Sequence, residues 1–160
     1  MSHYVARPYQ SWSDLPSLIE FAQNSTSARL PRASYYHPGD FVWQLYAFDE
    51  SDDVRLWRNG TDEGGIIACS IFEPPNEFQF AIDASFVDQE HLMGEIIWWA
   101  EQRRALVRNK EEVPLAAQSR GSNTLSTSAM ETDSARIAFL IEHGYALHEE
   151  TGFRVARDLT

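Results

Sequence analysis

Residues 123–145 read NTLSTSAMETDSARIAFLIEHGY, and this stretch decides which fold the chain can adopt. Its first part places Leu125, Thr127 and Ala129 at every second position, between more polar neighbours. An alternation of period two is typical of a strand that buries one face. The sequence therefore predicts a short strand of small residues at the start of this stretch.

The second part of the stretch predicts a helix that begins directly after the strand. Thr132 or Asp133 is expected to supply the side-chain oxygen that caps this helix. Its apolar residues recur at helical spacing and are Ile137, Leu140 and Ile141. Gly144 stands where a residue with left-handed backbone geometry commonly ends a helix, and Tyr145 then opens a new strand.

This order of strand, helix and glycine–aromatic pair, followed by two closing strands, resembles the C-terminal half of the GNAT superfamily of acyl-CoA N-acyltransferases. The family pattern contains Asn-x-x-Ala, then an aromatic–Tyr pair, then Gly-Phe. Residues 133–145 keep this frame, but Leu140 stands at the position of the family's tyrosine. Two further segments, residues 36–43 (YHPGDFVW) and 55–57 (RLW), look like parts of GNAT-like proteins that form the first of two fused acyltransferase domains.

Patterns elsewhere predict the order strand, helix, loop, three strands, long helix, strand, helix and two strands. Ser13 is expected to cap the first helix. Residues 29–40 contain two prolines and a glycine and predict a loop or a broken helix. Residues 49–53 read as an acidic turn, and Asn59 and Gly60 as the turn of a hairpin.

The long helix is predicted over about residues 88–108, where apolar residues recur at helical spacing. Together with the resemblance, this order implies an α/β fold with a mixed, mostly antiparallel central sheet of about seven strands and helices on both faces. The length of 160 residues fits a single GNAT-like domain over residues 1–160.

The chain is strongly acidic, with 24 Asp and Glu against 13 Lys and Arg and a formal net charge of −11. This charge disfavours nucleic acid or an anionic membrane surface as a partner. No apolar run approaches the roughly 20 residues that a membrane-spanning helix needs. The single cysteine, Cys69, lies in an apolar run and is expected to be a buried thiol, so we expect a reducing, cytoplasmic location.

The resemblance implies acetyl-CoA as co-substrate, held by backbone amides between the fourth strand and the long helix. Family members usually carry Gln/Arg-x-x-Gly-x-Gly/Ala there, because glycines allow close approach to the pyrophosphate and a helix N-terminus offers N–H groups. Residues 84–92 (ASFVDQEHL) contain neither glycine nor arginine, and Asp88 and Glu90 add negative charge. We therefore expect a degenerate loop with weak or absent binding. The backbone amides that could still hold the pyrophosphate are those of Gln89, Glu90, His91 and Leu92.

The resemblance also implies a general acid and a general base. Leu140 cannot donate a proton, and Tyr145 is a possible substitute, although an aromatic residue after a helix-ending glycine usually packs under the sheet. Glu77 and Asp83, at the two ends of the fourth strand, are the candidate bases, because a carboxylate there can take a proton from an amine. Each is also explained, and more simply, as a solvent-facing charge. The residues expected on the substrate side are His37 and Trp43, and no His or Cys spacing indicates a metal site.

Two functions remain open at this point. The first is an N-acetyltransferase that moves an acetyl group from acetyl-CoA to a primary amine, by direct attack in a ternary complex with Glu77 or a water as base. The alternative is a non-catalytic GNAT-fold module with a binding or structural role. The implied partners are a small-molecule amine for the enzyme, and a second copy of the chain or a second GNAT domain for the module.

Overall fold

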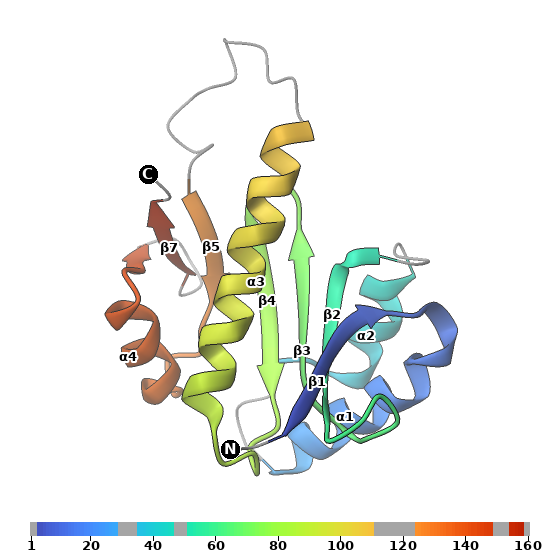
Figure 1. Ribbon diagram of the computed structural model, residues 1–160. Coiled ribbons are helices and arrows are strands. Elements are labelled where there is room, and N and C mark those ends of the chain that lie inside the picture. The colour runs from blue at the N-terminus through green and yellow to red at the C-terminus, as the bar shows by residue number, and fades with distance from the viewer. Residues whose placement is uncertain (1–2, 29–34, 47–50, 111–123, 149–153, 159–160) are drawn as a thin grey trace. The chain divides into compact units, whose positions relative to one another are not determined.

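The computed structural model describes residues 3–28, 35–46, 51–110, 124–148 and 154–158 (Figure 1). In chain order its elements are β1 (Tyr4–Tyr9), the short 3-10 helix η1 (Ser11–Ser13), α1 (Leu15–Ala28), α2 (Pro38–Leu45), β2 (Ser51–Asn59), β3 (Ile66–Glu73), β4 (Glu77–Ile82), α3 (Gln89–Lys110), β5 (Thr124–Ser128), α4 (Ser134–Glu142), β6 (Ala146–His148) and β7 (Arg154–Asp158).

The strands follow one another in the sheet in the order β1-β2-β3-β4-β5-β7-β6. The pairs β1–β2, β2–β3, β5–β7 and β6–β7 are antiparallel, whereas β4 and β5 are parallel. A parallel pair needs a long crossover connection, and α3 lies in the segment that joins β4 to β5. The predicted α/β fold with a mixed, mostly antiparallel sheet is therefore confirmed.

The chain divides into two compact units. Unit 1 comprises Met1–Ile71 and Phe80–Gln89, and unit 2 comprises Phe72–Gln79 and Glu90–Thr160. The dividing points fall within β3, within β4 and at the first residue of α3. Both β3 and β4 thus contribute residues to each unit.

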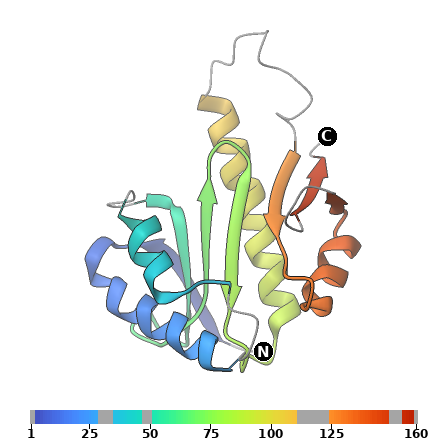
Figure 2. The same cartoon turned by 180° about the vertical axis from the view of Figure 1, so that it is seen from behind.

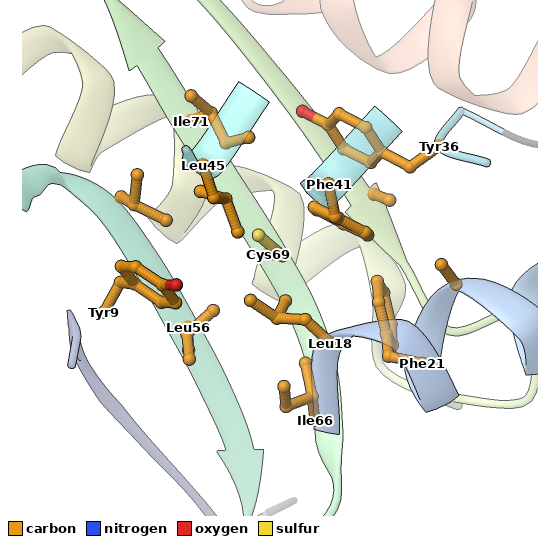
Figure 3. Packing of buried hydrophobic residues seen from close by; sticks show 13 residues of the cluster. Tyr9, Leu18, Phe21, Tyr36, Phe41, Leu45, Leu56, Ile66, Cys69 and Ile71 are labelled. Carbon is orange, nitrogen blue, oxygen red and sulfur yellow. The ribbon is translucent and has the colours of Figure 1, made fainter. Parts of the chain in front are cut away.

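Unit 1 has a hydrophobic core in which α1 and α2 lie on one face of β2 and β3 (Figure 2). Figure 3 shows Cys69 of β3 among side chains from both helices and from β2. The helices contribute Leu18, Phe21, Phe41 and Leu45, and β2 contributes Leu56. Cys69 is fully buried, as the sequence predicts, and this burial raises the pKa of its thiol. Such a thiol is inert at neutral pH.

A buried carboxylate, Asp14, joins β1, β2 and the start of α1. Arg7 of β1 binds it in a bidentate manner, with Nη1 donating to Oδ2 at 2.8 Å and Nη2 donating to Oδ1 at 2.6 Å. Arg58 of β2 donates from Nη2 to Oδ1 at 2.9 Å, and the backbone N–H of Gln10 donates to Oδ2 at 2.7 Å. Arg58 also donates to the carbonyl of Gly64 at 2.9 Å, which fixes the β2–β3 hairpin. The cluster therefore holds together elements that are far apart in sequence.

Three expectations for unit 1 are wrong. The predicted order omits α2. This helix can begin at Pro38 because proline fixes a helical φ and its missing N–H needs no partner in a first turn. Ser13 does not cap α1: it lies in η1, its hydroxyl donates to the carbonyl of Gln10, and Asp14 directly precedes α1. The predicted acidic turn overlaps β2, which already begins at Ser51. Residues 29–34 and 47–50 lie outside the described part of the chain.

Unit 2 confirms most of the prediction for residues 123–145. Leu125, Thr127 and Ala129 are buried while their neighbours on β5 are half-buried. Asp133 caps α4, and its Oδ1 accepts a hydrogen bond from the N–H of Arg136 at 3.2 Å. Gly144 follows α4 with a φ of 85°, a conformation that favours glycine. The final strands are β6 and β7, and residues 149–153, predicted to belong partly to strands, lie outside the described residues.

Replacing Asp14 by asparagine should lower the free energy of unfolding by about 3–5 kcal/mol, because the buried Arg58 loses its carboxylate partner. The exposed Glu20 on α1 offers the control E20Q, for which we expect a change within about 0.5 kcal/mol. Urea denaturation of the two variants measures the difference. Equal stability of D14N and E20Q would contradict the role assigned to this cluster.

The same cluster sets a dependence of stability on pH. Burial alone would raise the pKa of the Asp14 carboxyl, but hydrogen bonds from Arg7 and Gln10 outweigh it, so the pKa lies below its usual value. A lowered folded-state pKa means that the stabilisation is fully present above the unfolded pKa of about 4 and is lost as pH falls through the folded pKa. D14N should therefore lose less stability than the wild type in this acid range.

Candidate functional site

The connection between β4 and α3 is where a GNAT enzyme would hold the pyrophosphate, and its first half is a hydrogen-bonded turn in unit 1. Asp83 organises this turn, because its Oδ1 accepts hydrogen bonds from the N–H and the hydroxyl of Ser85, both at 2.8 Å. The N–H of Asp83 donates to the carbonyl of Ile67 at 2.8 Å, and Phe86 packs edge-on against Tyr4. One carboxylate oxygen of Asp83, a candidate base, therefore stabilises the turn.

The second half of the connection is the start of α3. Gln89 is its first residue, and the side-chain amide of Gln89 donates to the carbonyl of Ala84 at 3.1 Å. Glu90 and His91 are exposed, His91 lies 3.6 Å from Glu95, and Leu92 is fully buried. The N–H groups of a first helical turn have no acceptor within their helix, so they remain a potential anion site. Glu90 places a carboxylate in this same turn.

Gly94 does not serve as a phosphate-loop glycine. It lies inside α3, in the second turn, and a Cβ at this position would meet Cζ of Phe139 on α4 at 4.0 Å, an ordinary van der Waals contact. The position thus marks where α3 and α4 come together in unit 2 (Figure 1). The loop itself, residues 83–88, has no glycine.

The other candidate base, Glu77, belongs to unit 2 and lies on β4 beside Ser126 of β5. The parallel register of these strands is set by the pair Glu77 and Ser126, and Ser126 N–H donates to the carbonyl of Asn76 at 2.9 Å. Gln79, two residues along β4, donates from Nε2 to Oε1 of Glu77 at 3.3 Å. The hydroxyl of Ser128 donates to Oε1 of Gln79 at 2.6 Å.

These contacts form a polar row on one face of β4 and β5. Glu77, Gln79 and Ser128 are half-buried, whereas the alternate residues Phe78 and Leu125 are fully buried. Phe78 packs edge-on against Tyr145 with ring centroids 6.5 Å apart. One face of this strand pair is therefore apolar and packed, and the other carries carboxylate, amide and hydroxyl groups.

Leu140, at the position of the family's acid, and Tyr145, its possible substitute, are both buried in unit 2. Leu140 is fully buried and confirms the reading of this position as core. Tyr145 is 3% exposed, and its backbone N–H donates to the carbonyl of Leu140 at 3.0 Å as the chain leaves α4. The packing of its ring against Phe78 accounts for an aromatic residue at this position.

The two residues expected on the substrate side both belong to α2 or to its N-terminus in unit 1. His37 precedes α2, and its Nδ1 accepts a hydrogen bond from the N–H of Gly39 at 3.2 Å, so it acts as a cap. Trp43 is 83% exposed, beside the exposed Val42 and Tyr46. The inner face of the same helix carries the buried Phe41 and Leu45.

Sequence reasoning missed Gln79 and Ser128. Their types and spacing carry no motif, because the contact joins two strands separated by α3. The only available signal is the alternation along the strands: Gln79 falls on the same half-buried face of β4 as Glu77, and Ser128 falls on the half-buried face of β5. Among the described residues, no group of three or more His, Cys, Asp or Glu side chains could hold a metal ion. Nor does any helix in this part of the chain have the length and apolarity to cross a membrane.

Comparison with known proteins gives a fold. Neither a family model nor a curated protein sequence matches the chain. Solved structures do. A GCN5-related N-acetyltransferase from Sphaerobacter thermophilus is similar at 16% identity and a TM-score of 0.64, over 90% of this chain and 44% of that one. This chain thus spans less than half the length of that protein.

Two further structures match over nearly their whole length. An acetyltransferase of the GNAT family from Streptococcus pneumoniae has 12% identity and a TM-score of 0.62, over 99% of this chain and 100% of that one. A chain of the NatC complex bound to Gag peptide and CoA has 11% identity and a TM-score of 0.63, over 99% of both chains. At such identities the likeness defines the fold, and the chain has the GNAT fold.

Replacing Gly94 by alanine should stabilise the protein by about 0.5–1 kcal/mol, because alanine is the better helix former and the added methyl group meets no close contact. Gly144→Ala is the matched control. Its positive φ should make the same change destabilising by about 1–2 kcal/mol. Thermal denaturation of both variants measures the signs. A destabilised G94A would show that this position needs glycine for a reason other than helix packing.

Proposed function

We propose that this protein is an N-acetyltransferase that moves an acetyl group from acetyl-CoA to a primary amine, with Glu77 as the general base. The observation that supports this assignment best is the polar row at the junction of β4 and β5. There Glu77 is half-buried and held by a neutral donor, while Asp83 is committed to its turn. The GNAT fold supports acetyl-CoA as the acyl donor, and the co-crystallised CoA of the similar NatC complex agrees with it.

The chemistry assigned to the chain is a single acyl transfer. Glu77 removes a proton from the ammonium group of the acceptor, and the nitrogen lone pair then forms a bond to the thioester carbonyl carbon. The carbon–sulfur bond breaks and leaves a thiolate. Leu140 has no proton to give, and the ring of Tyr145 is packed in the interior, so a water passes to the thiolate the second proton that the nitrogen loses as it becomes an amide, while Glu77 returns the first proton to solvent. We place this reaction in the cytoplasm.

The weak point of the site is the binding of the pyrophosphate. The N-terminal amides of α3 suit an anion, but Asp88 and Glu90 bring like charge to it. Two unit charges about 5 Å apart at an effective dielectric near 20 repel by roughly 3 kcal/mol, which is about a hundredfold in affinity before screening. We therefore propose that acetyl-CoA binds weakly and more tightly as ionic strength rises.

Removing these two charges should strengthen binding. We expect the double variant Asp88→Asn with Glu90→Gln to bind acetyl-CoA at least tenfold more tightly than the wild type at low salt, with the gain shrinking as salt screens the charges. The control Glu131→Gln with Glu142→Gln removes equal charge outside the β4–α3 connection. Titration calorimetry measures both. An unchanged dissociation constant in the first variant would place the pyrophosphate elsewhere.

The role of Glu77 is tested by its amide. Glu77→Gln keeps the shape of the side chain and removes the base, so kcat for acetylation of a primary amine should fall about 10²- to 10⁴-fold. The dissociation constant of acetyl-CoA should stay the same. Glu142→Gln, on the exposed side of α4, should leave kcat unchanged. Release of the CoA thiol reports the rate, and full activity of E77Q would exclude this residue as the base.

A second candidate function is supported by the burial of Leu140 and by the acidic start of α3. A GNAT-fold module that does not bind acetyl-CoA would tolerate both, and would pair with another copy or with an active GNAT domain. The greater length of the Sphaerobacter thermophilus protein leaves room for a second domain there. Thermal denaturation with millimolar acetyl-CoA separates the two, because a bound ligand raises the melting temperature and a module without a site shows no shift.

A further inference from the structure

The side chain of Gln79 is held at both ends of its amide, and this sets its direction. Its Oε1 accepts the hydroxyl proton of Ser128 at 2.6 Å, and its Nε2 donates to Oε1 of Glu77 at 3.3 Å. An amide has one accepting and one donating end. A carboxylate can only accept a hydrogen bond, so the nitrogen is the end of the amide that faces Glu77. The hydroxyl of Ser128, which can donate or accept, then donates to Oε1 and holds the other end of the amide.

The three residues come from two strands that adjoin in unit 2. Glu77 and Gln79 are two positions apart on β4, and Ser128 lies two positions after Ser126, the register partner of Glu77. All three are half-buried, so water competes less for their hydrogen bonds than at an open surface. The contacts therefore restrict the rotamers of Glu77 where a base must point at its substrate.

We propose that Gln79 and Ser128 are positioning residues that aim the carboxylate of Glu77 for proton removal. This inference rests on the proposed acetyltransferase function. An amide does not titrate near neutral pH, so Gln79 orients the carboxylate and carries no proton itself. A misplacement of a reacting group by about 1 Å can cost about a hundredfold in rate. Because the pyrophosphate is proposed to bind at the start of α3, we expect changes in this row to leave the affinity for acetyl-CoA unchanged.

A purely structural role would have different consequences. The hydrogen bond between Gln79 and Ser128 also joins β4 to β5. If its role were purely structural, its loss would weaken the pairing of these strands and would have no direct effect on catalysis. In that case stability would fall, and kcat would follow the fraction of folded protein. A positioning role predicts a fall in kcat in protein that is fully folded, with an unchanged KM for acetyl-CoA.

The test compares Gln79→Leu, Ser128→Ala and Ser128→Thr with the control Gln102→Leu, whose parent residue is exposed on α3. The assay follows CoA thiol release with acetyl-CoA and a mixture of an aliphatic diamine, an amino acid amide and a peptide with a free N-terminus. We expect Q79L and S128A to lower kcat about 10- to 100-fold with KM for acetyl-CoA within twofold. S128T, which keeps the hydroxyl, should restore most of the rate, and Q102L should match the wild type.

A nuclear magnetic resonance measurement reads the contacts without turnover. The side-chain amide signals of Gln79, assigned by their absence in Q79L, should shift in Glu77→Ala and in S128A but not in Q102L. An active wild type whose kcat is unaffected by Q79L and S128A, or Gln79 signals that ignore both changes, would overturn the positioning inference alone. A wild type that releases no CoA above background would overturn the proposed function and this inference with it.

Discussion

The candidate site depends on how β4 and β5 meet. Parallel strands that are joined through a long helix have no turn to fix their register, so side chains and a few backbone bonds must do it. Here the register pair Glu77 and Ser126 and the bond from Ser126 to Asn76 fix the junction. The same junction places Gln79 between Glu77 and Ser128. A structural requirement of the crossover thus also brings together the groups to which we assign proton removal in the proposed function.

Electrostatics separates the two parts of the proposed reaction. A carboxylate helps where an ammonium group must lose a proton, and it hinders where a pyrophosphate must bind. The chain has carboxylates at both places, Glu77 on β4 and Glu90 in the first turn of α3. In the proposed reaction the first would favour an amine as substrate, and the second would weaken the binding of the acyl donor. Under the proposed function, we therefore expect activity to depend on affinity for acetyl-CoA more than on the acid–base chemistry.

Local patterns in the sequence predicted the elements whose signals are local. The alternation at Leu125 and Thr127, the cap at Asp133 and the turn at Gly144 each depend on a few neighbouring residues, and each is present. α2 was missed because Pro38 and Gly39 favour a loop, while the burial of Phe41 and Leu45 against α1 and β3 stabilises the helix. Tertiary packing outweighs propensity over so short a helix.

The polar contacts that join residues far apart in the chain could not be predicted. Asp14 looked like one more acidic residue near a helix start, yet it holds Arg58, 44 positions later. Ser128 read as one more small residue of a strand, yet it meets Gln79, 49 positions earlier. A sequence shows that a carboxylate or a hydroxyl is present but not which residue of a distant strand will form a hydrogen bond with it. The register of the sheet decides that, and it is also what turns Glu77 from a solvent-facing charge into a held carboxylate.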